Sequence, residues 1–257
     1  MILCIDVGNT HTVLCLTTTD EVIHNWRIRT DTRITADELS VTIFSLFRIT
    51  RLRSDDVDAI VVSSVVPPFT NIIKELAVKY FHISPIVVNA SLNIGMPIRY
   101  TDPATVGSDR IVNAAGAYEK YHTSMIIVDF GTATTFDCVS VNGEFMGGVI
   151  APGALISSEA LFNSTSQLPK VNIFTPPEGI IAQDTVNSIK SGILYGYAGL
   201  VDGIVKRMKK EMGSNPMVIA TGGLAHIFSD LSETIDTVEK FLTIYGLMTI
   251  FKKINQP

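Results

Sequence analysis

The sequence predicts an α/β fold made of two similar halves, each built around a mixed β-sheet. Two observations predict it. Short apolar runs of strand length alternate with amphipathic segments that have helical spacing. A pattern of strand, glycine turn and strand near the N-terminus returns about half a chain later, which indicates duplication of one α/β unit.

In the first half, strands are expected at 2–6, 13–19 and 22–29, with Asp20-Glu21 as the turn between the last two. Thr35 and Glu38 form a capping-box pattern that predicts a helix start, followed by apolar residues at helical spacing. A valine-rich strand, a helix opened by two prolines, a further strand and a helix are expected in that order, at 58–66, 67–77, 84–89 and 108–121.

The second half begins the pattern again. Three strands are expected at 124–130, 132–141 and 144–152, with Asn142-Gly143 as a hairpin signal between the last two. Helices at about 153–163 and 184–212, a strand at 216–221 that runs into a glycine turn, and closing helices complete the chain.

The repeat is expressed in matched positions at an offset of 123 residues. Asp6, Gly8 and Thr12 correspond to Asp129, Gly131 and Thr135. So few matches could arise by chance, but the shared strand–turn–strand context favours duplication, with halves expected at 1–115 and 116–257.

Composition narrows the function classes. The chain has 257 residues, of which 46% are hydrophobic and 18% charged, so it can bury a core. Its net charge of −5 does not indicate a nucleic-acid-binding surface. The three cysteines have no CxxC spacing and the five histidines form no metal-binding pattern, which argues against a disulfide framework and against zinc. No signal peptide or membrane-length apolar run is recognisable, so we expect a cytoplasmic location.

The segment DVGNTHT, which begins at Asp6, combines a flexible glycine, small hydroxyl donors and a carboxylate at a strand end. Those parts suit a phosphate held by amides and hydroxyls, with the carboxylate near a hydrated magnesium ion. DFGTATT, from Asp129, supplies the same parts again, and ATGGLA, from Ala220, allows a flat ring or ribose to approach the backbone. Alone, each motif is equally an ordinary turn.

Together the three motifs resemble the phosphate-1, phosphate-2 and adenosine signatures of the actin, hexokinase and Hsp70 superfamily. That resemblance implies a duplicated ribonuclease-H-like (actin-like ATPase) fold, with two mixed-sheet halves around a central cleft. The chain has neither GxxxxGK[ST] nor GxGxxG, so a P-loop or a Rossmann site is not indicated.

Further motifs narrow the family. MPIRYTDPATVGSDRIVNAAGAY, VDFGTATTFD, GEFMGGVIAPG and IKSGILYGYAGLVDGIVKRM, with the N-terminal segment, resemble a type III pantothenate kinase over nearly the whole chain, thinning after about residue 230. Two departures are visible: His11 stands where that family commonly has Asn, and Ser108 where it commonly has Ala. These two departures put the details of the phosphate contact in question, but they do not put the reaction in question.

The resemblance implies ATP-dependent phosphorylation of pantothenate, the first step of coenzyme A biosynthesis, by a homodimer. It implies that Asp109 is the general base, that Asp129 binds a monovalent cation, potassium or ammonium, and that Asp6 holds magnesium through water. The implied ATP contacts are Asp6, Val7, Gly8, Asn9, Thr10, His11, Thr12, Val13 and Thr132. The implied substrate contacts are Tyr100, Gly107, Ser108, Asp109, Arg110 and Thr185.

Alternatives stay open at this point. Asp109 could be an acid favoured by a helix N-terminus, Thr185 a helix cap, and Tyr100 a packed aromatic residue. Another small-molecule kinase of the same superfamily would have the same ATP turns, but would lack the stretch from Arg99 to Ala114. A nucleotide-binding regulator without turnover is the rival from a different class, and it would not need to keep Asp6, Asp109 and Asp129.

Overall fold

The computed structural model describes residues 1–255, which form two compact units. The first unit contains residues 1–121 together with the C-terminal segment from 242, and the second contains residues 122–241. The boundaries of the expected halves, 1–115 and 116–257, remain a prediction. The compact units differ from these halves in that the last helix belongs to the first unit.

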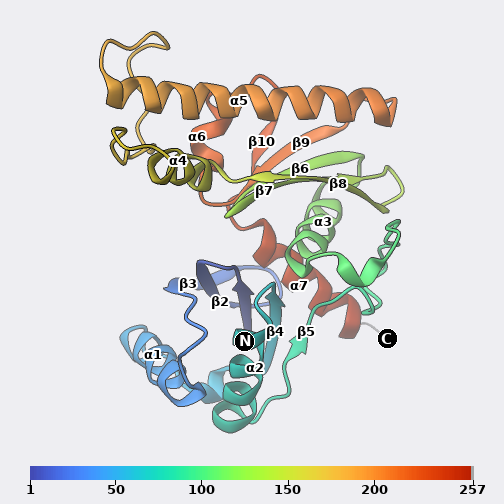
Figure 1. Ribbon diagram of the computed structural model, residues 1–257. Coiled ribbons are helices and arrows are strands. Elements are labelled where there is room, and N and C mark those ends of the chain that lie inside the picture. Colours follow the sequence, from blue (N-terminus) through green and yellow to red (C-terminus); the bar gives the residue numbers. More distant parts are fainter. Residues whose placement is uncertain (256–257) are drawn as a thin grey trace. The chain divides into compact units, whose positions relative to one another are not determined.

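The first unit contains a five-stranded sheet in the order β3-β2-β1-β4-β5 (Figure 1). Its strands are β1 (Ile2–Val7), β2 (His11–Thr17), β3 (Val22–Arg29), β4 (Ala59–Ser64) and β5 (Ile86–Val87). The three strands β1–β3 are antiparallel, and β4 and β5 continue the sheet in parallel with β1.

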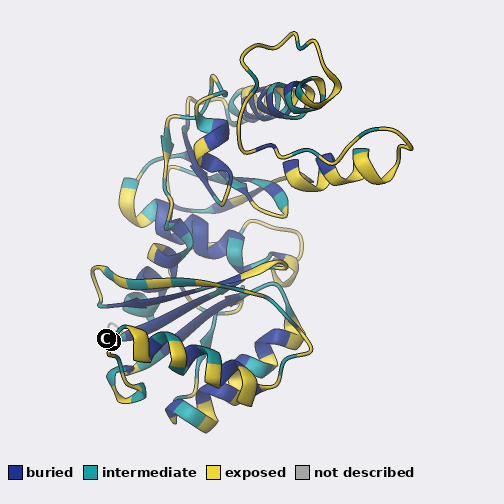
Figure 2. Cartoon of the chain, turned by 90° about the vertical axis from the view of Figure 1, so that its left-hand side faces the viewer, coloured by how far each residue is buried: buried dark blue, intermediate teal, exposed yellow. Residues whose placement is uncertain are grey.

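Helices cover both faces of this sheet. One face packs on α1 (Ala36–Ile49) and α2 (Pro67–Leu76), whose apolar residues form one core with β1, β2 and β4. Figure 2 shows the central strands buried and the outer sides of these helices exposed. The other face packs on α3 (Ser108–Tyr121) and α7 (Leu242–Asn255).

Local sequence signals explain the helix starts. Thr35 and Glu38 form the expected capping box: the Glu38 amide donates to Thr35 Oγ1 at 3.2 Å, and the Thr35 amide donates to Glu38 Oε2 at 2.8 Å. Two prolines occupy the first turn of α2, where an amide hydrogen is not needed. Both predicted helix starts are confirmed.

The second unit repeats the topology in its sheet, ordered β8-β7-β6-β9-β10. Its strands are β6 (Met125–Phe130), β7 (Ala133–Val139), β8 (Phe145–Pro152), β9 (Met217–Thr221) and β10 (Thr237–Val238). The antiparallel and parallel pairings follow the same scheme as in the first unit. Two mixed sheets of one topology confirm the predicted duplicated α/β fold.

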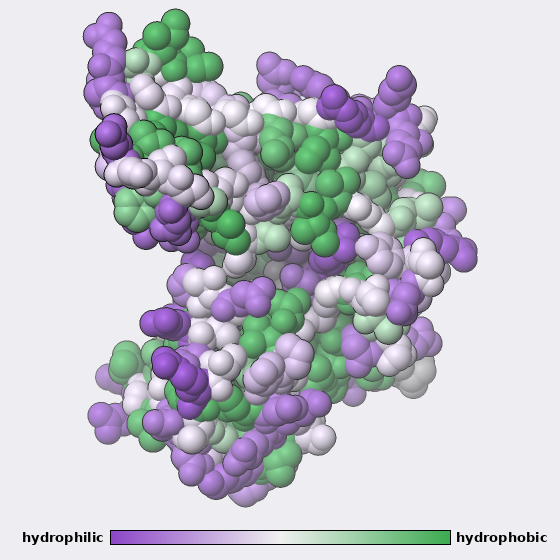
Figure 3. Space-filling view, viewed as in Figure 1, coloured by the Kyte–Doolittle hydropathy of each residue, from purple (hydrophilic) through white to green (hydrophobic). Residues whose placement is uncertain are grey.

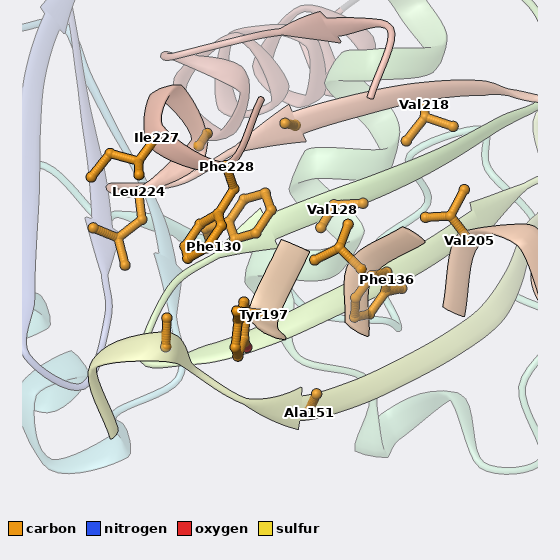
Figure 4. Close-up of a cluster of buried hydrophobic side chains, with 14 of the residues drawn as sticks. Val128, Phe130, Phe136, Ala151, Tyr197, Val205, Val218, Leu224, Ile227 and Phe228 are labelled. Atoms are coloured by element: carbon orange, nitrogen blue, oxygen red, sulfur yellow. The ribbon is translucent and has the colours of Figure 1, made fainter. Parts of the chain in front are cut away.

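Three helices cover one face of the second sheet: α4 (Ala154–Asn163), α5 (Thr185–Met212) and α6 (Ala225–Ser229). In this core Phe130 of β6 stacks on Phe228 of α6, with ring centroids 5.0 Å apart, and Tyr197 of α5 packs against Phe228 (Figure 4). The Tyr197 hydroxyl donates to Thr134 Oγ1 at 2.8 Å, so the one polar group in this cluster of rings is paired.

The repeat differs by one residue in its turns. Asp6 pairs with Val13 across the first turn, but Asp129 pairs with Thr135 across the second. The second turn is therefore one residue shorter, and the counterpart of Thr12 in the sheet is Thr134, not Thr135 as the sequence offset suggests. Thr12 and Thr134 are both buried, each beside the end of the first strand of its sheet.

α3 and α7 approach each other at two glycines. A Cβ on Gly246 would lie 2.0 Å from the carbonyl oxygen of Val112, and one on Gly116 would lie 2.7 Å from the Gly246 nitrogen. The Thr243 hydroxyl donates to Asn113 Oδ1 at 2.8 Å across the same contact. These distances require glycine at both positions, because no side chain fits between the two backbones.

Candidate active site

The first turn is held in place by the end of β3. The Gly8 amide donates to the His11 carbonyl at 3.0 Å, and the Thr30 amide donates to the Thr10 carbonyl at 3.1 Å. The Thr30 hydroxyl donates to the Gly8 carbonyl at 2.8 Å and lies 2.9 Å from Thr12 Oγ1. Thr30 therefore stabilises the turn, although no sequence motif indicated a role for Thr30.

The predicted ATP contacts of this turn differ in exposure, with Asp6, Gly8 and Val13 half-buried. Asn9, Thr10 and His11 are exposed at the tip, where a ligand can reach their polar groups. Val7 and Thr12 are buried toward the core, and the Thr12 hydroxyl is engaged by Thr30. Through its side chain Thr12 thus stabilises the turn, and its assignment as an ATP contact stays a prediction.

Asp6 lies at the end of β1 on the sheet face that packs on α3 and α7. It shares a row with Val13 of β2 and Ser63 of β4, and residues that are paired across a sheet point to the same side. The charge of Asp6 also contributes to raising the pKa of the Cys15 thiol to about 12, after burial and the neighbouring Cys4. The carboxylate is half-buried, so a ligand has access to it.

Ser108 ties the start of α3 to the end of β4. Its hydroxyl lies 3.2 Å from Ser63 Oγ, accepts from the Ser64 amide at 2.8 Å and donates to the Ser64 carbonyl at 3.0 Å. Because Ser63 is the sheet partner of Asp6, this tether holds Asp109, the next residue, beside the strand end that carries Asp6. The first unit therefore brings together two of the three predicted acidic residues.

The Asp109 carboxylate folds back over Gly107. A Cβ at Gly107 would lie 2.5 Å from Asp109 Oδ1, so glycine leaves room for that oxygen. Asp109 Oδ1 accepts from the Arg110 amide at 2.9 Å. This is the interaction expected if Asp109 is an acid favoured by a helix N-terminus. Burial raises the pKa of Asp109 despite this bond and the nearby charge of Arg110.

The second unit gathers the remaining nucleotide motifs. Asp129 pairs with Thr221 at the end of β9, and a Cβ on Gly222 would lie 2.4 Å from Asp129 Oδ1. Gly222 also has a φ of +91°, a conformation that glycine adopts without strain. The second phosphate turn and the adenosine turn predicted from the sequence are thus adjacent.

Gly153 closes the second turn from the other side. Its amide donates to the Thr132 carbonyl at 3.1 Å, and a Cβ there would lie 2.2 Å from the same oxygen. Gly153 follows β8 as Thr30 follows β3, and each donates its amide to the tip of its turn. The Thr132 side chain remains exposed at that tip.

Two predicted substrate contacts lie elsewhere within their units. Thr185 is the first residue of α5 and lines a surface cavity of about 590 Å³ with Leu161, Leu168 and Ile193. The helix cap is Asp184, which accepts from the Asn187 amide at 2.9 Å, so capping does not account for Thr185. Tyr100 lies in the loop before α3 and is partly exposed.

Among residues 1–255 no cluster of three or more His, Cys, Asp and Glu side chains is arranged for a metal ion. Within the same residues, no helix is both long and apolar enough to span a bilayer.

Solved structures of low sequence identity share this fold. Component A of (R)-2-hydroxyglutaryl-CoA dehydratase from Acidaminococcus fermentans matches 99% of both chains, with a TM-score of 0.58 and 14% identity. A protein described as a Baf family transcriptional activator from Campylobacter jejuni matches 98% of both chains, with a TM-score of 0.62 and 17% identity. With its two mixed sheets of one topology, the chain is defined as a protein of the actin-like ATPase fold.

Sequence relatives define the family. The model of the type III pantothenate kinase family matches residues 2–207. A type III pantothenate kinase of Syntrophus aciditrophicus is 52% identical over 98% of this chain and 99% of the relative, and one of Desulfatibacillum aliphaticivorans is 51% identical over 99% of both. The chain belongs to the type III pantothenate kinase family, and it is a pantothenate kinase.

Proposed function

We propose that the chain transfers the γ-phosphoryl group of ATP to the primary hydroxyl of pantothenate, with Asp109 as the general base. The observation that carries the proposal is the tether from Ser63 through Ser108. It holds Asp109 beside the end of the strand that carries Asp6. In this proposal, an acceptor alcohol at Asp109 and a phosphate chain at the turn after Asp6 meet within one unit.

The chemistry asked of Asp109 is modest. In phosphoryl transfer the transition state is loose, so positioning contributes more than strong basicity. The Asp109 carboxylate accepts the hydroxyl proton as the oxygen bonds to phosphorus and ADP leaves. Burial raises its pKa, which makes it a better proton acceptor than an exposed carboxylate.

The other predicted residues bind and orient. In the first turn Gly8 lets a phosphate approach the backbone, and Asn9 and Thr10 supply amides and the Thr10 hydroxyl. Thr132, in the second unit, supplies an amide and a hydroxyl of the same kind. Asp6 suits a magnesium ion, because that ion keeps most of its waters and needs few protein carboxylates, and when bound it neutralises phosphate charge. Asp129, with carbonyls of the adjacent turn, suits a monovalent cation.

The proposed substrate contacts come from the resemblance to the type III pantothenate kinases, and the chemistry of Arg110 supports one of them. The Arg110 guanidinium suits the pantothenate carboxylate because its planar fork matches two oxygens. Gly107, Tyr100 and Thr185 complete the proposed set. A cytoplasmic location follows from the coenzyme A pathway in which the product is used.

A homodimer is part of the proposal. Apolar side chains lie exposed over the second unit, as Figure 3 shows on one of its faces. Those on α4 and α5 and between them are Leu155, Ile156, Phe162, Phe174, Ile180, Ile181 and Val186. Surface of this kind is typical of a protein interface. Light scattering on a size-exclusion column should give twice the monomer mass of 28.0 kDa.

The deciding experiment measures ADP release from ATP with pantothenate, with and without potassium. Acetate and sugars serve as competing acceptors. Asp109→Asn should abolish turnover and leave ATP binding intact, while Asp55→Asn, an exposed aspartate paired with Arg53, is the matched control. Near-normal turnover of Asp109→Asn would rule out Asp109 as the base, and a preference for acetate or a sugar would rule out pantothenate.

A further inference from the structure

Strand β3 presents a cation on the same sheet face as the first acidic residue. Arg27 pairs with Val13 of β2, which pairs in turn with Asp6 of β1. Residues in one row of a sheet point to the same side, and neighbouring strands lie about 4.8 Å apart. The Arg27 side chain therefore starts two strands from Asp6, on the same face of the sheet.

The Arg27 guanidinium is directed toward the first turn by a hydrogen bond. Its Nη2 donates to His11 Nδ1 at 3.0 Å, and His11 directly follows the turn residues Gly8 to Thr10. Arginine has donors only, so His11 Nδ1 accepts and the ring is neutral in this contact. Burial, and after it the charge of Arg27, lower the pKa of His11, in agreement with that protonation state.

The charge of Arg27 is not neutralised by this contact. Among residues 1–255, no carboxylate lies within 4.0 Å of Arg27, and its polar contact is the uncharged imidazole. Arg33, in the same unit, is different: its Nε lies 3.2 Å from Asp31 Oδ1. Arg27 is thus an oriented cation beside a turn whose amides and hydroxyls suit an anion, and Arg29, opposite His11, adds a second positive charge to this strand.

We propose that Arg27, oriented by His11, binds the phosphate chain of the nucleotide at the first turn. This inference rests on the proposed function, because it takes ATP as the ligand of that turn. The guanidinium fork forms paired, charge-assisted hydrogen bonds with phosphate oxygens, and these are the stronger class of hydrogen bond. The anion site then has parts from β1, β2 and β3, whereas the sequence motif marks only the first two.

The chemistry also assigns a role to His11. An imidazole that accepts from Arg27 positions the guanidinium without competing for the phosphate, and it leaves the full positive charge available. His11 is a positioning residue in this arrangement, and Arg27 makes the contact with the ligand.

The test is binding of ATP, ADP and adenosine by titration calorimetry, without pantothenate. Arg27→Gln should weaken ATP binding about tenfold or more, because a hydrogen bond to a charged group is lost, and leave adenosine binding unchanged. In turnover assays KM for ATP should rise while KM for pantothenate stays constant. Arg33→Gln, at an arginine already paired with Asp31, is the matched control and should bind ATP as the wild type does.

His11 is tested by two variants that differ in one property. His11→Leu removes the acceptor and should weaken ATP binding, whereas His11→Asn retains an acceptor and should restore most of it. Arg27→Gln that binds ATP like the wild type, or that loses adenosine and ATP affinity equally, would overturn the inference. Wild-type protein that binds ATP but leaves pantothenate unphosphorylated would contradict the proposed function instead, so the two proposals fail by different measurements.

Discussion

The contact between α3 and α7 leads to a sharp prediction about Gly246. Changing Gly246 to Ala places a Cβ 2.0 Å from the carbonyl oxygen of Val112, and both groups belong to helix backbones that cannot rotate away. The two helices must separate, and Val112, Leu247 and Ile250, all fully buried, lose contacts on both sides. The chain should therefore become less stable although alanine is the better helix former.

The magnitude follows from two opposing effects. Replacing glycine by alanine inside a helix normally gains about 0.5–1 kcal/mol. Overpacking of a buried contact costs about 1–3 kcal/mol, and a radial gap of about 0.5–1 Å forfeits a quarter to a half of each neighbouring dispersion contact. Since backbone atoms meet here, we expect the upper end of the overpacking cost, and therefore a net loss of about 2 kcal/mol in the free energy of unfolding.

Urea unfolding followed by tryptophan fluorescence and circular dichroism measures this change, and Trp26 reports on the first unit. Gly199→Ala in α5 is the control, because nothing lies within 4 Å of the added Cβ in the chain. It should be neutral or stabilising by up to about 1 kcal/mol. If Gly246→Ala unfolds at the same urea concentration as the wild type, the two helices do not need glycine at their contact.

Three further predictions concern the site. Asp109→Asn should raise the melting temperature at pH 7 while it abolishes turnover. Burial raises the pKa of Asp109 in the folded state, so the contribution of Asp109 to stability is present at low pH and is lost as the pH rises through the folded-state pKa. A difference in melting temperature between variant and wild type that stays the same from pH 4 to 8 would contradict this. Thr30→Val should cost about 1–3 kcal/mol and weaken ATP binding, because it removes the hydroxyl that joins Gly8 and Thr12; a thermal melt with ATP titration tests it, and wild-type values for both would refute it. Gly222→Ala should reduce ATP affinity and stability together, since its φ is +91° and its Cβ would meet Asp129 Oδ1; intact affinity in calorimetry would argue against that contact.

The sequence was sufficient for the repeated sheets and for most helix starts, because both depend on local patterns. Apolar strand runs ending in Asp6 and Asp129 predicted the two halves, and the long helix expected at 184–212 is α5, Thr185–Met212. What the sequence could not provide is register. A turn shorter by one residue makes Thr134, not Thr135, the counterpart of Thr12, and that shift is visible only in the strand pairing.

The supporting residues of the site were missed for a related reason. Thr30, Ser63 and Gly153 are common residues at strand ends, and their importance comes from partners far away in the sequence. No local pattern marks a hydroxyl that will meet a turn 22 residues earlier, as the Thr30 hydroxyl meets the Gly8 carbonyl. The return of α7 to the first unit was likewise unpredictable, because its glycine contact with α3 joins two distant segments.

The division of the chain has a consequence for synthesis on the ribosome. Residues 122–241 are complete as a unit before the last segment emerges, whereas the unit that begins at Met1 must wait for Leu242 and the residues after it. A nascent chain interrupted before that point carries a sheet with one of its covering helices missing. Emergence of α7 from the ribosome therefore sets the moment at which Asp6 and Asp109 acquire their final surroundings, and chains that terminate before α7 lack those surroundings.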